Sequence, residues 1–220
     1  MGVEYLTEVE AKELAGQAGI PVVETVLAHN REDAQTVADR LGYPVVIKIV
    51  SREIVHKSDA GGVKLNLETA AQVGTAYDDI MAAVADRNPD AEILGVSVQQ
   101  MARPGVEVII GMSKDADFGP VLMFGLGGIF VEVLKDVSFR IAPIARHDAK
   151  EMINEISGVA LLQGYRGTEP VDLTALENLL LKVSGLVESN PDLEVMDLNP
   201  VFLYRDGAMV VDARMAVAAR

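Results

Sequence analysis

The sequence predicts an α+β fold built from two parts, and two observations support this. Segments with helical signals alternate with apolar segments typical of strands, and several strand segments follow one another directly, as hairpins do. The turn Ala102-Arg103-Pro104-Gly105 is the best candidate for a boundary between subdomains. Since 50% of the 220 residues are hydrophobic, the chain can bury a sizeable core.

The pattern before this boundary begins with a helix. It is expected after Thr7, which forms a capping box with Glu10, and Gly19 ends it. The segment 45–50 is apolar on both faces except at Lys48, as in a buried strand. The other elements expected here are strands over residues 22–28, 63–67 and 93–101 and helices over 31–41, capped by Asn30, and 69–86.

The pattern after the boundary predicts more strands than helices. Strands are expected over residues 106–112, 121–124, 137–144, 194–204 and 208–213, and helices over 148–156 and 173–188. A turn at residues 205–207 joins the last two strands, so residues near 199 and 212 are expected to face each other.

The composition excludes several classes of function. A net charge of −14 argues against nucleic acid or an anionic membrane as the main partner. The absence of cysteine excludes disulfides, a thiol nucleophile and a cysteine metal site. No apolar run approaches the roughly 20 residues that cross a bilayer, and the first residues lack the basic region of a signal peptide. These features predict a cytoplasmic protein.

Two common nucleotide-binding motifs are missing from the sequence. There is no Walker-type phosphate loop. The segment 125–130 has Phe130 where a dinucleotide fingerprint requires its third glycine. His29, His56 and His147 lack the spacing of metal ligands. Any nucleotide site must therefore be built in another way.

The loop at residues 56–63 carries the most informative chemistry. Gly61 and Gly62 would let backbone N–H groups approach a phosphate, and Lys57 would supply a positive charge. The imidazole of His56 is a nucleophile able to receive a phosphoryl group. The alternative is an ordinary solvated histidine in a glycine turn.

Lys48 is a charge within an otherwise apolar strand. Lysines are rarely buried unless they are paired. One interpretation is a phosphate contact that reaches into a cleft, and the other is a lysine that protects an edge strand from pairing with another chain.

A second polar cluster lies near the end of the chain. Asp197 and Asn199 share one strand face by the two-residue period, and Asp212 lies on the facing strand. Their oxygen atoms are ligands that Mg²⁺ prefers. The alternative is turn chemistry on a solvated strand.

Three further charged residues are candidates for the site. Glu107 is a candidate for binding ribose hydroxyls or the metal, and the alternative is an ordinary carboxylate on the surface. Arg140 and Arg166 are candidates for binding the oxygen atoms of an anion, and the alternative for each is a structural salt bridge.

Together these residues resemble an ATP-grasp domain. More narrowly, the chain is similar over nearly all 220 residues to the beta subunit of nucleoside-diphosphate-forming acyl-CoA synthetases of the ADP-forming acetyl-CoA type. The histidine loop and Asp197-Leu198-Asn199-Pro200 are the specific motifs. The supporting motifs are Glu8-Val9-Glu10-Ala11-Lys12 with Gly19-Ile20-Pro21, Val46-Ile47-Lys48, Gln100-Met101, Pro104-Gly105-Val106-Glu107, Phe118-Gly119-Pro120, Gly125-Leu126-Gly127-Gly128 and Gly164-Tyr165-Arg166-Gly167.

The resemblance implies a fold and a site. It implies two ATP-grasp subdomains with ATP or ADP between them. Residues 21–101 would carry the phosphohistidine loop, and residues 102–220, with helix 1–20 packed on them, would carry the Mg²⁺ site. The implied contacts are Gln100 and Met101 to adenine, Lys48 to phosphate, Glu107 to ribose, and Asn199 and Asp212 to Mg²⁺. Lys57, Gly61, Gly62 and Arg140 are further candidates for binding the nucleotide.

The resemblance also implies an activity. The enzyme would convert acyl-CoA, ADP and phosphate into a carboxylic acid, ATP and CoA. His56 would be the catalytic carrier that takes the phosphoryl group from a CoA-binding alpha subunit, in an α2β2 assembly, and passes it to ADP. Asp197 would orient the ring of His56. No acyl or CoA pocket is recognisable, so acyl specificity is expected in the partner.

Two other functions remain open from the sequence. Similar ATP-grasp domains lie beside protein acetyltransferases, where the nucleotide site is regulatory or degenerate; the presence of His56, Asn199 and Asp212 disfavours this. A direct ATP-dependent carboxylate ligase would need its own acceptor pocket and would leave His56 without a covalent role.

Overall fold

The structure is a computed structural model that describes residues 2–54, 57–128, 135–167 and 169–219. By its contacts the chain divides into two compact units. We call Met1–Leu6, Ala11–Val22 and Pro104–Arg220 the large unit, and Thr7–Glu10 and Val23–Arg103 the small unit.

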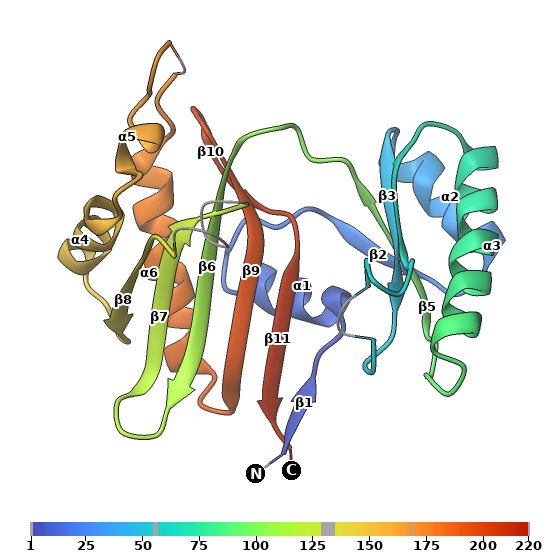
Figure 1. The fold of residues 1–220 in the computed structure, drawn as a ribbon, viewed down its shortest axis with the longest axis horizontal. Helices are drawn as coiled ribbons and strands as arrows, with labels where there is room; N and C mark the ends of the chain where they lie inside the picture. Colours follow the sequence, from blue (N-terminus) through green and yellow to red (C-terminus); the bar gives the residue numbers. More distant parts are fainter. Residues whose placement is uncertain (1, 55–56, 129–134, 168, 220) are drawn as a thin grey trace. The chain divides into compact units, whose positions relative to one another are not determined.

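The large unit is built on an antiparallel sheet. Its strand order is β1-β11-β9-β6-β7-β8, with β10 paired to β9 (Figure 1). The strands are β1 (Val3–Tyr5), β6 (Val106–Asp115), β7 (Gly119–Leu126), β8 (Val137–Ile141), β9 (Leu193–Tyr204), β10 (Gly207–Val210) and β11 (Ala213–Ala218).

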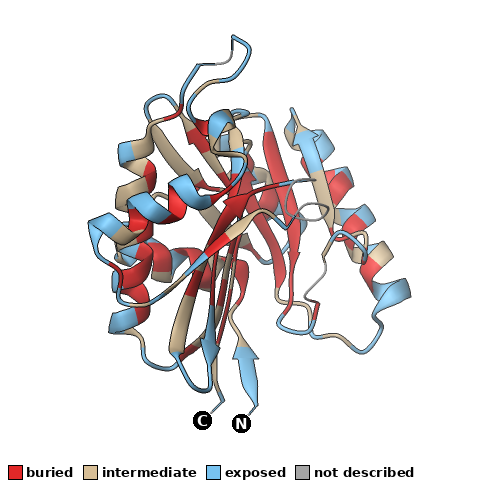
Figure 2. Cartoon of the chain, turned by 60° about the vertical axis from the view of Figure 1, so that its left-hand side comes forward, coloured by how far each residue is buried: buried red, intermediate tan, exposed pale blue. Residues whose placement is uncertain are grey.

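Helices cover one face of this sheet. Figure 1 shows α1 (Glu8–Gln17) and α6 (Leu173–Ser189) on the same side of the strands. Phe124, Met196 and Leu179 belong to the core that forms there, and Figure 2 shows the buried residues concentrated on the strands and on the helix sides that face them. The shorter helices are α4 (Arg146–Glu155) and α5 (Val159–Leu162).

The small unit is a four-stranded antiparallel sheet with two helices. Its strand order is β2-β5-β3-β4, so β3 is an interior strand. Ile47 and Ile49 of β3 pack with Ile80 and Val84 in its core. The elements are β2 (Thr25–Ala28), α2 (Arg31–Leu41), β3 (Val45–Val50), β4 (Val63–Leu67), α3 (Ala70–Arg87) and β5 (Gly95–Gln100).

The predicted helix starts are confirmed in atomic detail. The backbone N–H and the hydroxyl of Thr7 donate to Glu10 Oε2 over 2.7 and 2.9 Å, which is the expected capping box. The side chain of Asn30 accepts from the N–H of Asp33 over 2.9 Å. Each side chain satisfies backbone groups that the first turn leaves without helical partners.

Other boundaries differ from the prediction. The strand expected over 208–213 is wrong: it breaks at Val211 and Asp212 into β10 and β11, which pair with different parts of β9. Strand β1 and helix α5 were not predicted, because segments of three and four residues are too short to show a period. Among the described residues, no helix is long and apolar enough to cross a membrane.

Candidate functional site

Lys48 lies in the middle of the interior strand β3. The residue is only 6% exposed, and its ammonium donates to Glu8 Oε1 over 2.7 Å. The side chain of Glu8 is fully buried. The edge-strand interpretation of Lys48 is therefore wrong, because β3 is paired on both sides by β5 and β4. The phosphate contact of Lys48 stays a prediction.

Glu8 also binds the lysine of the histidine loop. The ammonium of Lys57 donates to Glu8 Oε2 over 3.2 Å, so the two oxygens of one carboxylate bind two lysines. Glu8 was not predicted as a site residue, although it belongs to the opening segment that carries the family resemblance. The available signal was Lys48 itself, because a lysine in a buried strand requires a buried counter-ion.

The backbone N–H groups of Gly61 and Gly62 form hydrogen bonds within the turn of the loop itself. The N–H of Gly61 donates to Ser58 O over 3.0 Å, and that of Gly62 donates to Lys57 O over 2.8 Å. In this conformation neither N–H is free for the predicted phosphate nest. Gly61 has a φ of +72°, and a Cβ at Gly62 would overlap the side chain of Ile49, so both positions need glycine.

His56 lies outside the described residues. The loop that follows it is tied to the small unit by two further contacts. Arg87 Nη1 donates to Asp59 O over 2.8 Å, and the N–H of Ile49 donates to Gly62 O over 2.7 Å. The stem of the loop is therefore anchored to α3 and β3.

Asp197 faces Arg214 across the pairing of β9 and β11. Their side chains approach to 3.5 Å, between Arg214 Nη2 and Asp197 Oδ2. The pKa of Asp197 is raised above its ordinary value, and burial of the carboxyl is the main cause. The charge of Arg214 lowers this pKa and the charge of Asp212 raises it, and both effects are smaller than that of burial. Nε of Arg214 is buried and has no hydrogen-bond partner among the described residues. Arg214 was not predicted as a site residue, because an arginine in a terminal strand carries no local motif.

Asn199 and Asp212 lie opposite each other where the last strand breaks. The N–H of Asn199 donates to Asp212 O over 3.2 Å, and Asp212 Oδ1 accepts from the N–H of Ala213 over 2.9 Å. Within the described ranges no group of three or more His, Cys, Asp or Glu side chains could hold a metal. A carboxylate and an amide oxygen fit Mg²⁺, which binds few protein ligands and keeps positions for water and phosphate.

Glu107 lies on β6 opposite Phe202 of β9. It is exposed, and the N–H of Gly127 donates to its carbonyl over 2.8 Å. A Cβ at Gly127 would lie 2.9 Å from Glu107 Cβ, and one at Gly128 would lie 3.4 Å from Oε2. The glycines therefore let the segment after β7 run directly against Glu107, whose ribose contact stays a prediction.

Gln100 and Met101 lie at the end of β5. Gln100 pairs with Val45 of β3, and the N–H of Met101 donates to Pro44 O over 2.9 Å. That N–H is therefore already used within the small unit, and the contact of this segment to adenine stays a prediction.

The two predicted arginines form structural contacts. Arg140 Nη1 lies 2.8 Å from Glu155 and Nη2 lies 3.6 Å from Glu151, which ties β8 to α4. The hydrogen bond that Arg140 donates to the carboxylate of Glu155 is the main cause of the raised pKa of Arg140. The guanidinium of Arg166 lies 5.4 Å from the ring centre of Tyr165. Both side chains thus have partners other than phosphate, and their phosphate contacts stay predictions.

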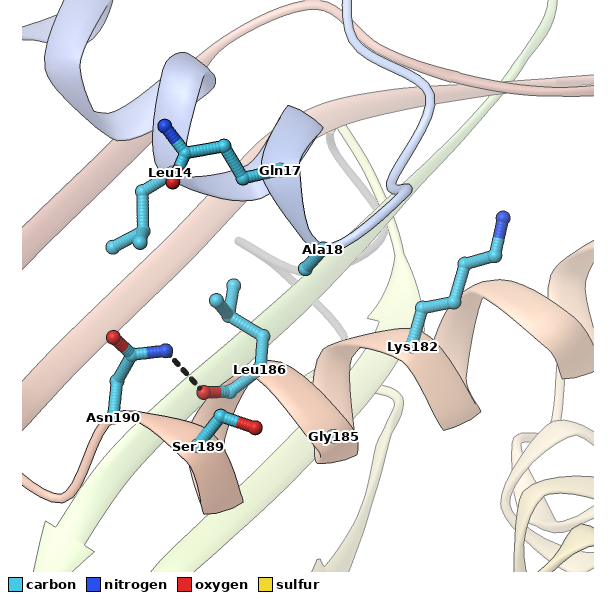
Figure 3. A pocket seen from close by; sticks show the side chains of 8 residues that line it. All are labelled: Leu14, Gln17, Ala18, Lys182, Gly185, Leu186, Ser189 and Asn190. Atoms are coloured by element: carbon cyan, nitrogen blue, oxygen red, sulfur yellow. Dashed lines mark hydrogen bonds between the residues drawn. The ribbon is translucent and has the colours of Figure 1, made fainter.

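A hollow of about 490 Å³ lies between α1 and α6 (Figure 3). Its one charged lining residue is Lys182, whose ammonium donates to Gly19 O over 2.6 Å. Figure 3 shows small residues, Ala18 and Gly185, on its two walls. None of the predicted site residues that the structure describes lines this hollow.

Comparisons with known proteins agree on one family. The sequence model of the ATP-grasp domain matches residues 1–217. The chain is 50% identical over 210 residues to "Acetate--CoA ligase [ADP-forming] I subunit beta" of Pyrococcus furiosus, covering 96% of this chain and 90% of that protein.

Solved structures give the same result. One of them is a structure of the dinucleotide-forming acetyl-coenzyme A synthetase 1 of Ca. Korarchaeum cryptofilum with coenzyme A and Ca-AMPCP. It superposes on this chain with a TM-score of 0.95, and the two sequences are 47% identical. The match covers 98% of this chain and 94% of that chain. A second structure of this synthetase holds coenzyme A and Mg-AMPPCP, with its phosphohistidine segment pointing towards the nucleotide-binding site. Its TM-score is 0.85 at 44% identity, over 98% and 93% of the two chains.

Proposed function

Because the chain belongs to the ATP-grasp family, among the nucleotide-binding beta subunits of ADP-forming acyl-CoA synthetases, we propose that His56 relays a phosphoryl group to ADP. The enzymes of this family are ADP-forming acid–thiol ligases that use ATP and ADP. In the direction of ATP synthesis they convert acyl-CoA, ADP and phosphate into a carboxylic acid, CoA and ATP. The regulatory alternative finds no support in these relatives.

The relay consists of two balanced transfers. In the first, Nε2 or Nδ1 of neutral His56 attacks phosphorus, and the N–P bond forms as the bond to the donor breaks. In the second, a β-phosphate oxygen of ADP attacks the same phosphorus, and the neutral imidazole leaves. Asp197 orients the ring by accepting its other N–H. Asp197 is therefore a positioning residue in this proposal.

One observation carries the proposal more than any other. Lys48 of β3 and Lys57 of the histidine loop are paired with a single buried carboxylate, that of Glu8. Two ammonium groups held on one carboxylate are suited to phosphate oxygens, and Lys57 directly follows His56 in the sequence. The phosphohistidine segment described for the Korarchaeum synthetase supports the same chemistry for this loop.

The remaining contacts follow the ATP-grasp pattern. We propose that Lys48, Lys57, Gly61, Gly62 and Arg140 contact phosphate, Glu107 the ribose, and Gln100 and Met101 the adenine. The small unit supplies the histidine loop, and the large unit supplies the metal-binding residues. Bound at Asn199 and Asp212, Mg²⁺ would neutralise charge on the nucleotide phosphates.

The chain works with a CoA-binding partner subunit, as the name of its beta-subunit relative implies. We propose an α2β2 heterotetramer in the cytoplasm, with neither nucleic acid nor a membrane as a partner. Acyl specificity then resides mostly in the partner.

Labelling with γ-labelled ATP tests the relay. With Mg²⁺ and the partner subunit, the wild-type chain should acquire a label that is stable to base and labile to acid, in a peptide that contains His56. The β,γ-methylene analogue AMPPCP should give no label, because its terminal phosphonate cannot be transferred. A wild-type complex that makes ATP from acyl-CoA without a label on this peptide would disprove the relay.

Replacing Asp212 tests the metal residues. Asp212→Ala should weaken Mg²⁺-dependent binding of ADP at least about tenfold, because a carboxylate ligand is lost. Calorimetric titration of the nucleotide with and without Mg²⁺ measures this. Asp206→Ala, in the turn between β9 and β10, is the matched control and should bind as the wild type does. Equal binding by both variants would remove Asp212 from the site.

A further inference from the structure

Glu8 is a buried charge for which the proposed relay has no role. Its side chain is fully buried, in contrast to the first-turn carboxylate Glu10, whose side chain is 41% exposed. Carboxylates are almost never fully buried unless they are paired, and Glu8 is paired with Lys48 and Lys57. These contacts join the start of α1 to β3 and to the histidine loop, over sequence separations of 40 and 49 residues.

The arrangement resembles the binding of a phosphate by two lysines. One carboxylate faces two ammonium groups, so these three groups together keep a positive charge. A phosphate dianion offers more negative charge and one more oxygen than a carboxylate. Charge-assisted bonds to phosphate should therefore compete with the bonds to Glu8. Glu8 thus occupies both ammonium groups while no phosphate is bound.

The position of Lys57 links this pair to the reactive side chain. Lys57 directly follows His56 in the sequence, so the position of its backbone limits the positions open to His56. The N–H of Gly62 donates to the carbonyl of the same Lys57, which closes the turn of the loop. A contact that holds the ammonium of Lys57 therefore restrains the whole loop from one end.

We propose that Glu8 is a positioning residue of the relay: it retains the histidine loop by binding Lys57, and it yields this partly exposed lysine to phosphate while its bond to the buried Lys48 keeps the carboxylate paired. This inference rests on the proposed relay through His56 and adds to it a device for releasing the loop. Arrival of a phosphate, on the nucleotide or on His56, exchanges one anion for another at Lys57.

The substitution Glu8→Gln tests this in the complete complex with the partner subunit. It removes the competing charge and keeps the size of the side chain. AMPPCP measured without Mg²⁺ should bind about three- to tenfold more tightly, a gain of up to about 1.4 kcal/mol. Amide hydrogens of residues 57–62 should exchange faster in the absence of nucleotide. A merely structural ion pair would not tighten nucleotide binding when it is lost.

The control is Glu10→Gln, on the same turn of α1. Glu10 pairs with Arg52 and caps Thr7, and glutamine can still form the cap. This variant should match the wild type in both measurements. Unchanged or weaker AMPPCP binding by Glu8→Gln would overturn the inference.

A second variant keeps the inference testable if Glu8→Gln does not fold, because breaking a buried ion pair destabilises a protein. Lys57→Gln removes only the partly exposed lysine and should also speed exchange of residues 58–62, while weakening AMPPCP binding several-fold. Unchanged exchange in this variant would overturn the inference. Failure of the relay itself is separate: it would appear as a wild-type complex without a label at His56.

Discussion

The variant His56→Ala is expected to lose the phosphohistidine label completely and at least about 10³-fold in kcat for ATP formation. The methyl group of alanine cannot form an N–P bond, so the phosphoryl group has no carrier to ADP. Binding of AMPPCP should be nearly unchanged, because the imidazole is a transfer group in this scheme and not a nucleotide ligand. Labelling, steady-state kinetics and titration together separate transfer from binding.

His147→Ala is the matched control for this experiment. His147 lies on α4, its side chain is 79% exposed, and its Nε2 lies 3.1 Å from Glu151. The control should keep both the label and the activity. Normal labelling of His56→Ala would show that another residue carries the phosphoryl group. The histidine loop would then have only a structural role.

The variant Asp197→Asn is expected to slow labelling of His56 by about 10²-fold or more. Asparagine keeps the shape of the side chain but removes the negative charge that favours one ring orientation and stabilises the N–H bond. The affinity for AMPPCP and the melting temperature should change little, because the side chain is partly exposed and its contact with Arg214 is 3.5 Å long. Rapid-quench labelling measures the rate.

Glu194→Gln provides the control on the same strand. Glu194 pairs with Lys114 over 2.8 Å and lies away from the proposed chemistry at the start of β9. It should label at the wild-type rate. If Asp197→Asn instead labels normally but binds nucleotide poorly, Asp197 belongs to the nucleotide site and does not position the histidine.

Local patterns predicted much of the fold. The capping box at Thr7 and the cap at Asn30 are confirmed because each depends on residues three positions apart. The buried strand at 45–50 is confirmed because the segment is apolar on both faces except at Lys48. The break between β10 and β11 was missed, because an apolar run of strand type does not show which partner each half takes.

The sequence by itself determined the family, the α+β class, the positions of most elements and the residue types of the candidate site. Only the tertiary structure decided which charges meet. Glu8 reaches Lys48 across 40 residues, and Arg140 meets Glu155 on a neighbouring helix. The physical reason is that periodicity and capping act over a few residues, whereas a buried charge is matched by whichever group the fold brings beside it. Lys48 and Lys57 were identified as candidates from the sequence, but their pairing with the carboxylate of Glu8 was decided by the fold.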